Sequence, residues 1–201
     1  MPFPTTPSST PGTATTRRSA PNARTSPSGA SGGGEVRPWP TPDVPGPGQE
    51  SVWDYPRPPR LEEFHGRITI ELGGQTVAST ARGWRVLETS HPPTYYLPRE
   101  SFDAGVLRPA AGSSWCEWKG RAAYFDLVTP ARTAERAAWT YSTPTAGFAP
   151  LGGALAVMAA AVDRCTVDGE EVRPQPGGFY GGWITSRVTG PFKGIPGSMG
   201  W

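Results

Sequence analysis

Glycine and proline make up about a quarter of this 201-residue chain, with 26 Gly and 25 Pro. Both residues interrupt regular structure, because proline lacks an amide hydrogen and glycine loses much backbone entropy on folding. They divide the chain into short runs separated by turn signals. This distribution of glycine and proline favours short strands over long helices.

The interruptions are densest before residue 51. The only bulky apolar residues of this segment after Met1 are Phe3, Val36, Trp39 and Val44. So little apolar area cannot offset the entropy of ordering the segment. We therefore predict a disordered Pro/Ser/Thr/Gly-rich tail over residues 1–50 and a single β-rich domain over residues 51–201, which is an ordinary domain size.

Charge and cysteine content exclude several classes of protein. The formal net charge is only +2 and no basic run occurs, so we expect no nucleic-acid partner. No apolar run reaches the 18 residues of a membrane span, and the first residues lack the apolar core of a secretory signal. Residues 1–34 have the Arg-rich, acid-free composition of a transit peptide, but their Pro and Gly oppose an amphipathic helix. With Cys116 and Cys165 as reduced thiols, we expect a soluble, cytoplasmic protein.

Hairpin signals dominate the rest of the chain. Residues 67–72 and 75–80 alternate apolar and polar side chains across Gly73-Gly74, and residues 164–167 and 170–172 flank Asp168-Gly169. Such pairs predict tight type I′ turns. Further strands are expected over residues 84–88, 94–97, 115–118, 121–128 and 136–141. The aromatic-rich segment 177–201 is expected to wrap the core.

One α-helix is predicted near residues 150–162. Pro150 suits a first helical turn, and Leu151, Leu155, Met158 and Val162 recur at helical spacing. The sum is a mainly β fold, a small antiparallel barrel or sandwich with this one helix.

Two neighbouring segments, residues 88–98 and 115–124, hold most of the chemically capable side chains. One of the two histidines, one of the two cysteines and a lysine lie there among aromatic residues. Such groups converging on a concave, aromatic-lined surface are typical of a ligand pocket. The candidate ligand-binding residues are Glu88, Ser90, His91, Tyr96, Cys116, Lys119 and Tyr124.

Catalysis would require more than these residue types. Cys116 could act as a nucleophile if His91 lay within hydrogen-bond reach, and otherwise it is a small buried side chain between two tryptophans. Zinc would need both Cys and both His without any short ligand spacing, so we expect no metal and no cofactor. Lys119 and Gly120 could receive an anion, but the phosphate-binding loop and the Gly-x-Ser-x-Gly elbow are both absent.

The chain resembles the domain of unknown function 427 family over residues 53–201. The segments that carry the resemblance are YPRPPRLEEFHGRITIELGGQTVAST, RVLETSHPPTYYLPRE, SWCEWKGRAAYFDL, AAWTYSTPTAGFAPLGGALAVMAAAVDRCTVDGEEVRPQPGGFYGGWITSRVTGPFKG and the terminal GW. The resemblance implies a β-rich single domain and no established activity. The family has at times carried a nucleotidyltransferase label. That chemistry normally uses clustered carboxylates that hold Mg²⁺, and the sequence has no Asp-x-Asp or comparable pair.

Three hypotheses about function follow. The first is a domain that binds a small molecule or protein through a pocket built from residues 88–98 and 115–124. The second is an enzyme that uses Cys116 or His91, or acts on a phosphorylated ligand. The third is a structural or interaction module. If His91, Cys116 and Lys119 line one pocket, the first two gain support.

Overall fold

The structure, a computed structural model, describes residues 39–201. The tail predicted for residues 1–50 therefore lies mostly outside the described residues. Its last residue is part of the fold, because β1 (Glu50–Ser51) pairs in parallel with β13 (Val188–Thr189). The domain boundary expected at residue 51 falls inside this strand.

The first sheet is antiparallel, with strand order β10-β9-β2-β3-β4. Its strands are β2 (Arg60–Leu72), β3 (Gln75–Leu87), β4 (Thr94–Tyr96), β9 (Arg164–Val167) and β10 (Glu170–Glu171). Both predicted hairpins are confirmed. Gly73 and Gly74 have φ of 63° and 75°, and Asp168 and Gly169 have φ of 51° and 84°. Positive φ at both central residues is the conformation that type I′ turns require.

The separate strand expected over residues 84–88 is instead the second half of β3. Gly83 does not interrupt β3, because it pairs with Phe64 inside the β2–β3 ladder. A Cβ atom built on Gly83 would lie 2.5 Å from the carbonyl oxygen of Tyr96. Glycine is needed there because it lets the backbone of β4 approach closely.

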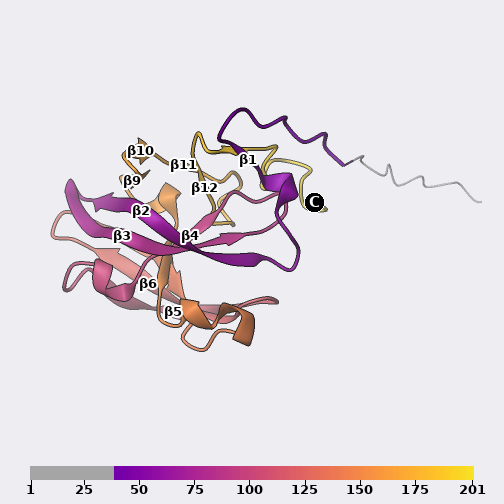
Figure 1. The fold of residues 1–201 in the computed structure, drawn as a ribbon. Helices are drawn as coiled ribbons and strands as arrows, with labels where there is room; N and C mark the ends of the chain where they lie inside the picture. Colours follow the sequence, from indigo (N-terminus) through magenta and orange to yellow (C-terminus); the bar gives the residue numbers. More distant parts are fainter. Residues whose placement is uncertain (1–38) are drawn as a thin grey trace, which may run out of the picture. The chain divides into compact units, whose positions relative to one another are not determined.

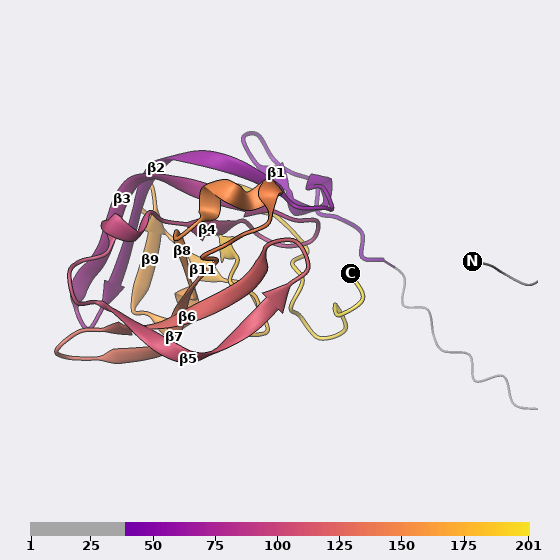
Figure 2. The ribbon, with the colours of Figure 1, turned by 90° about the horizontal axis from the view of Figure 1, so that it is seen from below.

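The second sheet is also antiparallel, with order β5-β6-β7-β8. Its strands are β5 (Leu107–Cys116), β6 (Gly120–Val128), β7 (Thr133–Thr140) and β8 (Leu155–Val157). Leu97 and Leu155 exchange backbone hydrogen bonds of 2.8 and 2.9 Å, which join the two sheets next to β4 and β8. The β2–β3 ribbon and the β5–β6–β7 ribbons face each other across the core (Figures 1 and 2). The fold is mainly β, as predicted.

The predicted helix at residues 150–162 is wrong. The segment contains the end of the 3₁₀ helix η3 (Ala146–Leu151), then strand β8, then the short 3₁₀ helix η4 (Ala159–Ala161). Gly152 and Gly153 end η3, and all three residues of β8 are buried. A strand that is buried on both faces has a continuous apolar run, which periodicity alone does not distinguish from a buried helix.

The other helices are equally short, namely η1 (Val52–Asp54) and η2 (Arg99–Ser101). Within residues 39–201 no helix has the length and hydropathy that a membrane crossing requires.

The C-terminal segment packs on the core, as predicted. β11 (Arg173–Pro174) pairs with β12 (Trp183–Ile184). Trp183 is 1% exposed, and its indole nitrogen donates to the carbonyl of Val157 at 2.9 Å. Phe179 is an exception, since most of its side chain is exposed.

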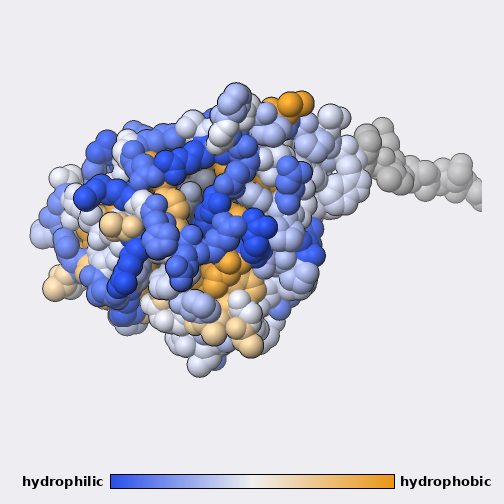
Figure 3. All heavy atoms as spheres, in the orientation of Figure 1, coloured by the Kyte–Doolittle hydropathy of each residue, from blue (hydrophilic) through white to orange (hydrophobic). Residues whose placement is uncertain are grey.

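Buried side chains form three groups. The largest lies between the two sheets and includes Ile68, Ile70, Leu97, Leu127 and Leu155. Hydrophilic residues cover most of the face drawn in Figure 3, and hydrophobic residues reach the surface there mainly in its lower half. A second group packs beside the candidate site, and a third holds η1 against β12 and β13.

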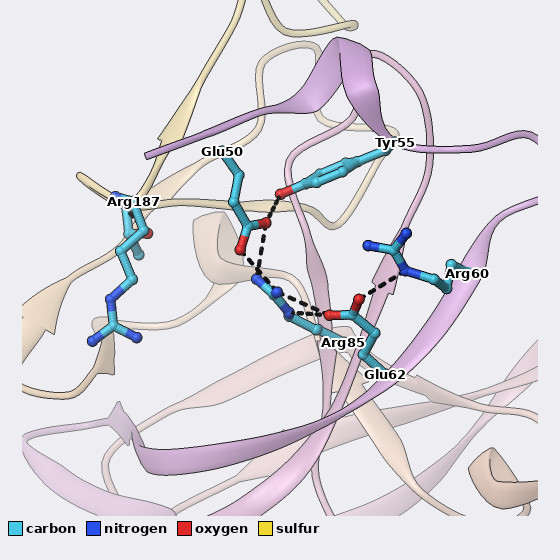
Figure 4. Close-up of polar contacts among 7 residues, drawn as sticks. Glu50, Tyr55, Arg60, Glu62, Arg85 and Arg187 are labelled. Atoms are coloured by element: carbon cyan, nitrogen blue, oxygen red, sulfur yellow. Dashed lines mark hydrogen bonds and ion pairs between the residues drawn. The ribbon is translucent and has the colours of Figure 1, made fainter. Parts of the chain in front are cut away.

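A polar network holds β1 and η1 to the first sheet (Figure 4). Arg85 on β3 donates two hydrogen bonds to Glu50, at 2.9 and 3.1 Å, and one to Glu62 at 3.0 Å. The Tyr55 hydroxyl also donates to Glu50, at 2.6 Å, and Arg60 donates to Glu62. Burial acts to raise the pKa of Glu50, but the bonds from Arg85 and Tyr55 outweigh it and leave that pKa below its usual value.

Candidate ligand cavity

Six of the seven predicted ligand-binding residues line one cavity of about 850 Å³. They are Glu88, His91, Tyr96, Cys116, Lys119 and Tyr124. This volume is within the range of small-molecule sites. The two segments singled out in the sequence, residues 88–98 and 115–124, thus meet at one place.

Strands of both sheets and the C-terminal segment build the walls. Val86 comes from β3, Tyr96 from β4, Cys116 from β5, Tyr124 from β6 and Trp139 from β7. Residues 178–181 of the C-terminal segment complete the lining. β4 and β5 lie in different sheets, and the Leu97–Leu155 pairing joins these sheets.

Ser90 is the predicted residue that does not line this cavity. It is fully buried, with a left-handed φ of 68°. Its amide donates to Val52, and its carbonyl accepts from the amide of Lys193. Its hydroxyl oxygen is enclosed without a hydrogen-bond partner among the described residues. The structure therefore places Ser90 in the turn between β3 and β4, next to the site.

His91 is held rigidly in the cavity wall. Its Nδ1 lies 3.0 Å from the Thr89 carbonyl, and its ring meets the ring of Tyr180 edge-on, with centroids 4.7 Å apart. Burial lowers the pKa of His91, and the Thr89 carbonyl and Glu88 offset this only in part. The neutral imidazole is therefore favoured.

Cys116 is the last residue of β5, whereas His91 lies in the turn between β3 and β4, and no hydrogen bond joins the two within residues 39–201. Cys116 is partly exposed and packs with the apolar group beside the cavity. The geometry gives no support to a Cys116–His91 nucleophile and base. The second thiol, Cys165, is buried in the core, and that burial raises its pKa to about 12.

Eight aromatic residues are the largest group of side chains in the cavity lining. The aromatic residues that line it, apart from the imidazole of His91, are Tyr96, Trp115, Trp118, Tyr124, Trp139, Tyr141, Phe179 and Tyr180. The Trp139 indole donates to the Tyr96 hydroxyl at 3.3 Å, and the rings of Tyr96 and Tyr141 are 6.4 Å apart. Burial raises the pKa of both tyrosines, so both phenols are neutral near pH 7.

Four cations and two acids complete the lining, and three of the cations have protein partners. Arg57 pairs with Glu88 at 3.3 Å. Arg136 donates to the Ala111 carbonyl and lies over the ring of Tyr124.

The other two cations are the lysines. Lys193 donates to the carbonyl of Trp201 at 2.7 Å. Burial lowers the pKa of Lys193, and the positive charge of the nearby Arg57 lowers it further. Lys119 has no hydrogen bond or ion pair to any described residue, although it is only 8% exposed.

Sequence reasoning missed several members of the cavity. Trp139 is in β7 and Tyr141 directly follows its last residue, and in extended chain two residues at this spacing point to the same side, so the spacing was a usable signal. Arg57, Tyr180 and Lys193 had no such signal, because only long-range packing brings them to the cavity. Among the described residues no group of three or more His, Cys, Asp or Glu is placed to hold a metal ion.

The architecture and the cavity define a β-rich domain with an aromatic pocket at the junction of two sheets. The family model described as "Domain of unknown function (DUF427)" matches residues 60–168, which is more than half of the chain. The protein belongs to this family. No curated protein matches the chain. The matched region holds the six predicted cavity residues, whereas Phe179, Tyr180 and Lys193 lie beyond it.

Proposed function

We propose that this DUF427 domain binds a small organic molecule in the cavity between β4, β5 and the C-terminal segment. The observation that supports this most directly is the lining itself. A cavity of about 850 Å³ is lined by eight aromatic side chains together with several charged and polar ones. Aromatic surface and polar groups that converge on one concave region are typical of small-molecule sites.

The rigidity of the walls also favours ligand binding. Tyr96 is held by the Trp139 indole, and His91 is held by the Thr89 carbonyl and Tyr180. Side chains that are already fixed lose little entropy when a ligand binds, so more of the contact energy appears as affinity.

Cys116 provides a direct assay of occupancy. It lines the cavity and is partly exposed, whereas Cys165 is buried with a pKa of about 12. Iodoacetamide should therefore label Cys116 in the folded protein and spare Cys165. A library of small organic compounds is then screened. Intact mass spectrometry identifies compounds that slow the labelling of Cys116, and thermal denaturation shows which of these raise the melting temperature.

A matched pair of tryptophan variants tests whether the compounds bind in the cavity. Trp139→Ala removes a wall, and Trp39→Ala removes a tryptophan that is 65% exposed and does not line the cavity. Compounds that protect Cys116 should lose affinity in Trp139→Ala and keep it in Trp39→Ala. If no compound protects Cys116, or if stabilising compounds leave its labelling unchanged, the proposal is wrong and a structural or interaction module is favoured. Should Trp139→Ala fail to fold, prior alkylation of wild-type Cys116 by N-ethylmaleimide should block the same compounds.

A further inference from the structure

We propose that the ligand is an aromatic anion, a planar ring system with one carboxylate or phosphate group, and that the Lys119 ammonium binds its anionic group. This inference rests on the proposed function. It starts from the one cation of the cavity lining for which the described residues provide no polar partner.

Lys119 is buried without the contacts that a buried ammonium needs. Its Nζ lies 5.9 Å from the centroid of the Tyr141 ring and 5.6 Å from that of Phe148. These distances are near the outer limit of a cation–π contact. They leave three N–H donors free, and burying an ammonium without acceptors is costly.

The Lys119 ammonium can be reached from the cavity. Within residues 39–201, Ser90 Oγ is the one fully enclosed polar side-chain atom without a hydrogen-bond partner. The Lys119 Nζ, which also lacks one, must therefore keep some accessible surface. Since Lys119 lines the cavity, a bound ligand can reach this surface.

The other cations of the lining already have partners. Arg57, Arg136 and Lys193 already donate to protein oxygens, and one of the two acids, Glu88, is paired with Arg57. An incoming anion therefore has an unoccupied cation at Lys119. An incoming cation would meet Lys119 and Lys193 in the same space, which disfavours it.

The backbone fixes Lys119 in this position. It ends the tight turn between β5 and β6, and Gly120 follows it with a φ of 93°. The amide of Thr145 donates to the Lys119 carbonyl at 3.3 Å, and the Thr145 hydroxyl donates to the Trp118 carbonyl. With the turn anchored, the ammonium has a constant place beside the aromatic walls. Those walls favour a flat ring as the body of the ligand.

Four probes separate the two features of the proposed ligand. 2-Naphthoate and 2-naphthyl phosphate carry both the ring and the charge, 2-naphthamide keeps the ring without the charge, and cyclohexanecarboxylate keeps the charge without the aromatic ring. Binding to the full-length chain is measured by calorimetry and by protection of Cys116. One or both naphthyl anions should bind at least about tenfold more tightly than 2-naphthamide and than cyclohexanecarboxylate, since a charge-assisted bond to the ammonium is added to the ring contacts.

Three variants assign the preference to Lys119. Lys119→Met keeps the apolar stem and should remove the preference for the anion over the amide, while Lys119→Arg should retain most of it. Arg121→Met lowers the net charge equally at an exposed neighbouring position that does not line the cavity, and it should leave the preference unchanged.

The inference is overturned if 2-naphthamide binds as tightly as both anions, or if the preference survives in Lys119→Met. Equal binding of 2-naphthoate and cyclohexanecarboxylate would also overturn its aromatic part. If neutral compounds from the screen protect Cys116 while no naphthyl anion does, the ligand class is wrong and the proposed function stands. If no compound of either set protects Cys116, both fail.

Discussion

Replacing Arg85 by methionine should destabilise the fold by an amount that depends on pH. Arg85 is the centre of the network in Figure 4, where it contacts Glu50 of β1 and Glu62 of β2. Methionine keeps most of the apolar stem and removes the charge. Glu50 and Glu62 then lose their shared cation, and β1 loses its main polar contact with the first sheet.

The expected loss of stability lies between the values typical of exposed and of buried ion pairs. Exposed ion pairs contribute about 0–1 kcal/mol, and removing one partner of a fully buried pair costs about 3–5 kcal/mol. The Arg85 side chain is 20% exposed and that of Glu50 is 39% exposed, so solvent screens the pair partly. We therefore expect a loss of about 2 kcal/mol at pH 7.

The sign of the pH dependence follows from Glu50. Its pKa in the folded protein lies below the ordinary value of 4.5, so the unfolded chain takes up the proton first as the pH falls. The stability that the pair contributes is fully present above about pH 4.5 and is lost as the pH falls through the folded pKa. The difference between wild type and Arg85→Met should therefore shrink between pH 7 and pH 3.

Urea denaturation across this pH range measures the difference. Arg60→Met is the matched control, because the Arg60 side chain is 52% exposed and its ion-pair partner among residues 39–201 is Glu62 alone. It should cost less than about 0.5 kcal/mol. A loss for Arg85→Met that is equal at pH 7 and pH 3, or no larger than the loss for Arg60→Met, would refute this account of the network.

Three further predictions concern single residues. Gly169→Val should lower the stability measured by urea denaturation by about 1–2 kcal/mol, because φ is 84° at this position. Nothing lies within 4 Å of the new Cβ, so backbone strain alone would cause the loss. An unchanged stability would contradict the type I′ turn. Trp183→Phe should cost about 2–3 kcal/mol through lost volume and the unpaired Val157 carbonyl, whereas Trp39→Phe should be neutral. His91 should titrate below its ordinary pKa of 6.5 in an NMR experiment, with its contribution to stability decreasing as the pH falls below 6.5. A normal midpoint would show that the ring is solvated.

Local turn chemistry explains which parts of the fold were predictable. The Gly73-Gly74 and Asp168-Gly169 hairpins need only positive φ at two adjacent residues, and this requirement is visible in the sequence. Strand β8 was mistaken for a helix because its burial on both faces removes the alternation that identifies a strand. The continuity of β3 through Gly83 was not predictable, because the close contact of Gly83 with β4 is not a local property.

The site was predictable as two segments but not as a cavity. Residue chemistry indicated residues 88–98 and 115–124, whereas their meeting depends on the Leu97–Leu155 pairing between the sheets. Ser90, which the sequence also indicated, is fully buried and does not line this cavity. The sequence could not show that Lys119 lacks a polar partner while the other cations of the lining have one, because these contacts depend on the three-dimensional structure.

Indole NMR tests most directly the claim that ligands occupy the cavity. The chain has eight tryptophans. Trp115, Trp118 and Trp139 line the cavity, whereas Trp53 and Trp183 donate to the carbonyls of Pro191 and Val157 elsewhere. On titration with a compound that protects Cys116, the indole signals of Trp115, Trp118 and Trp139 should shift together, with one affinity, and those of Trp53 and Trp183 should stay in place. Shifts confined to Trp53 and Trp183, or spread equally over all five, would contradict a ligand site in this cavity.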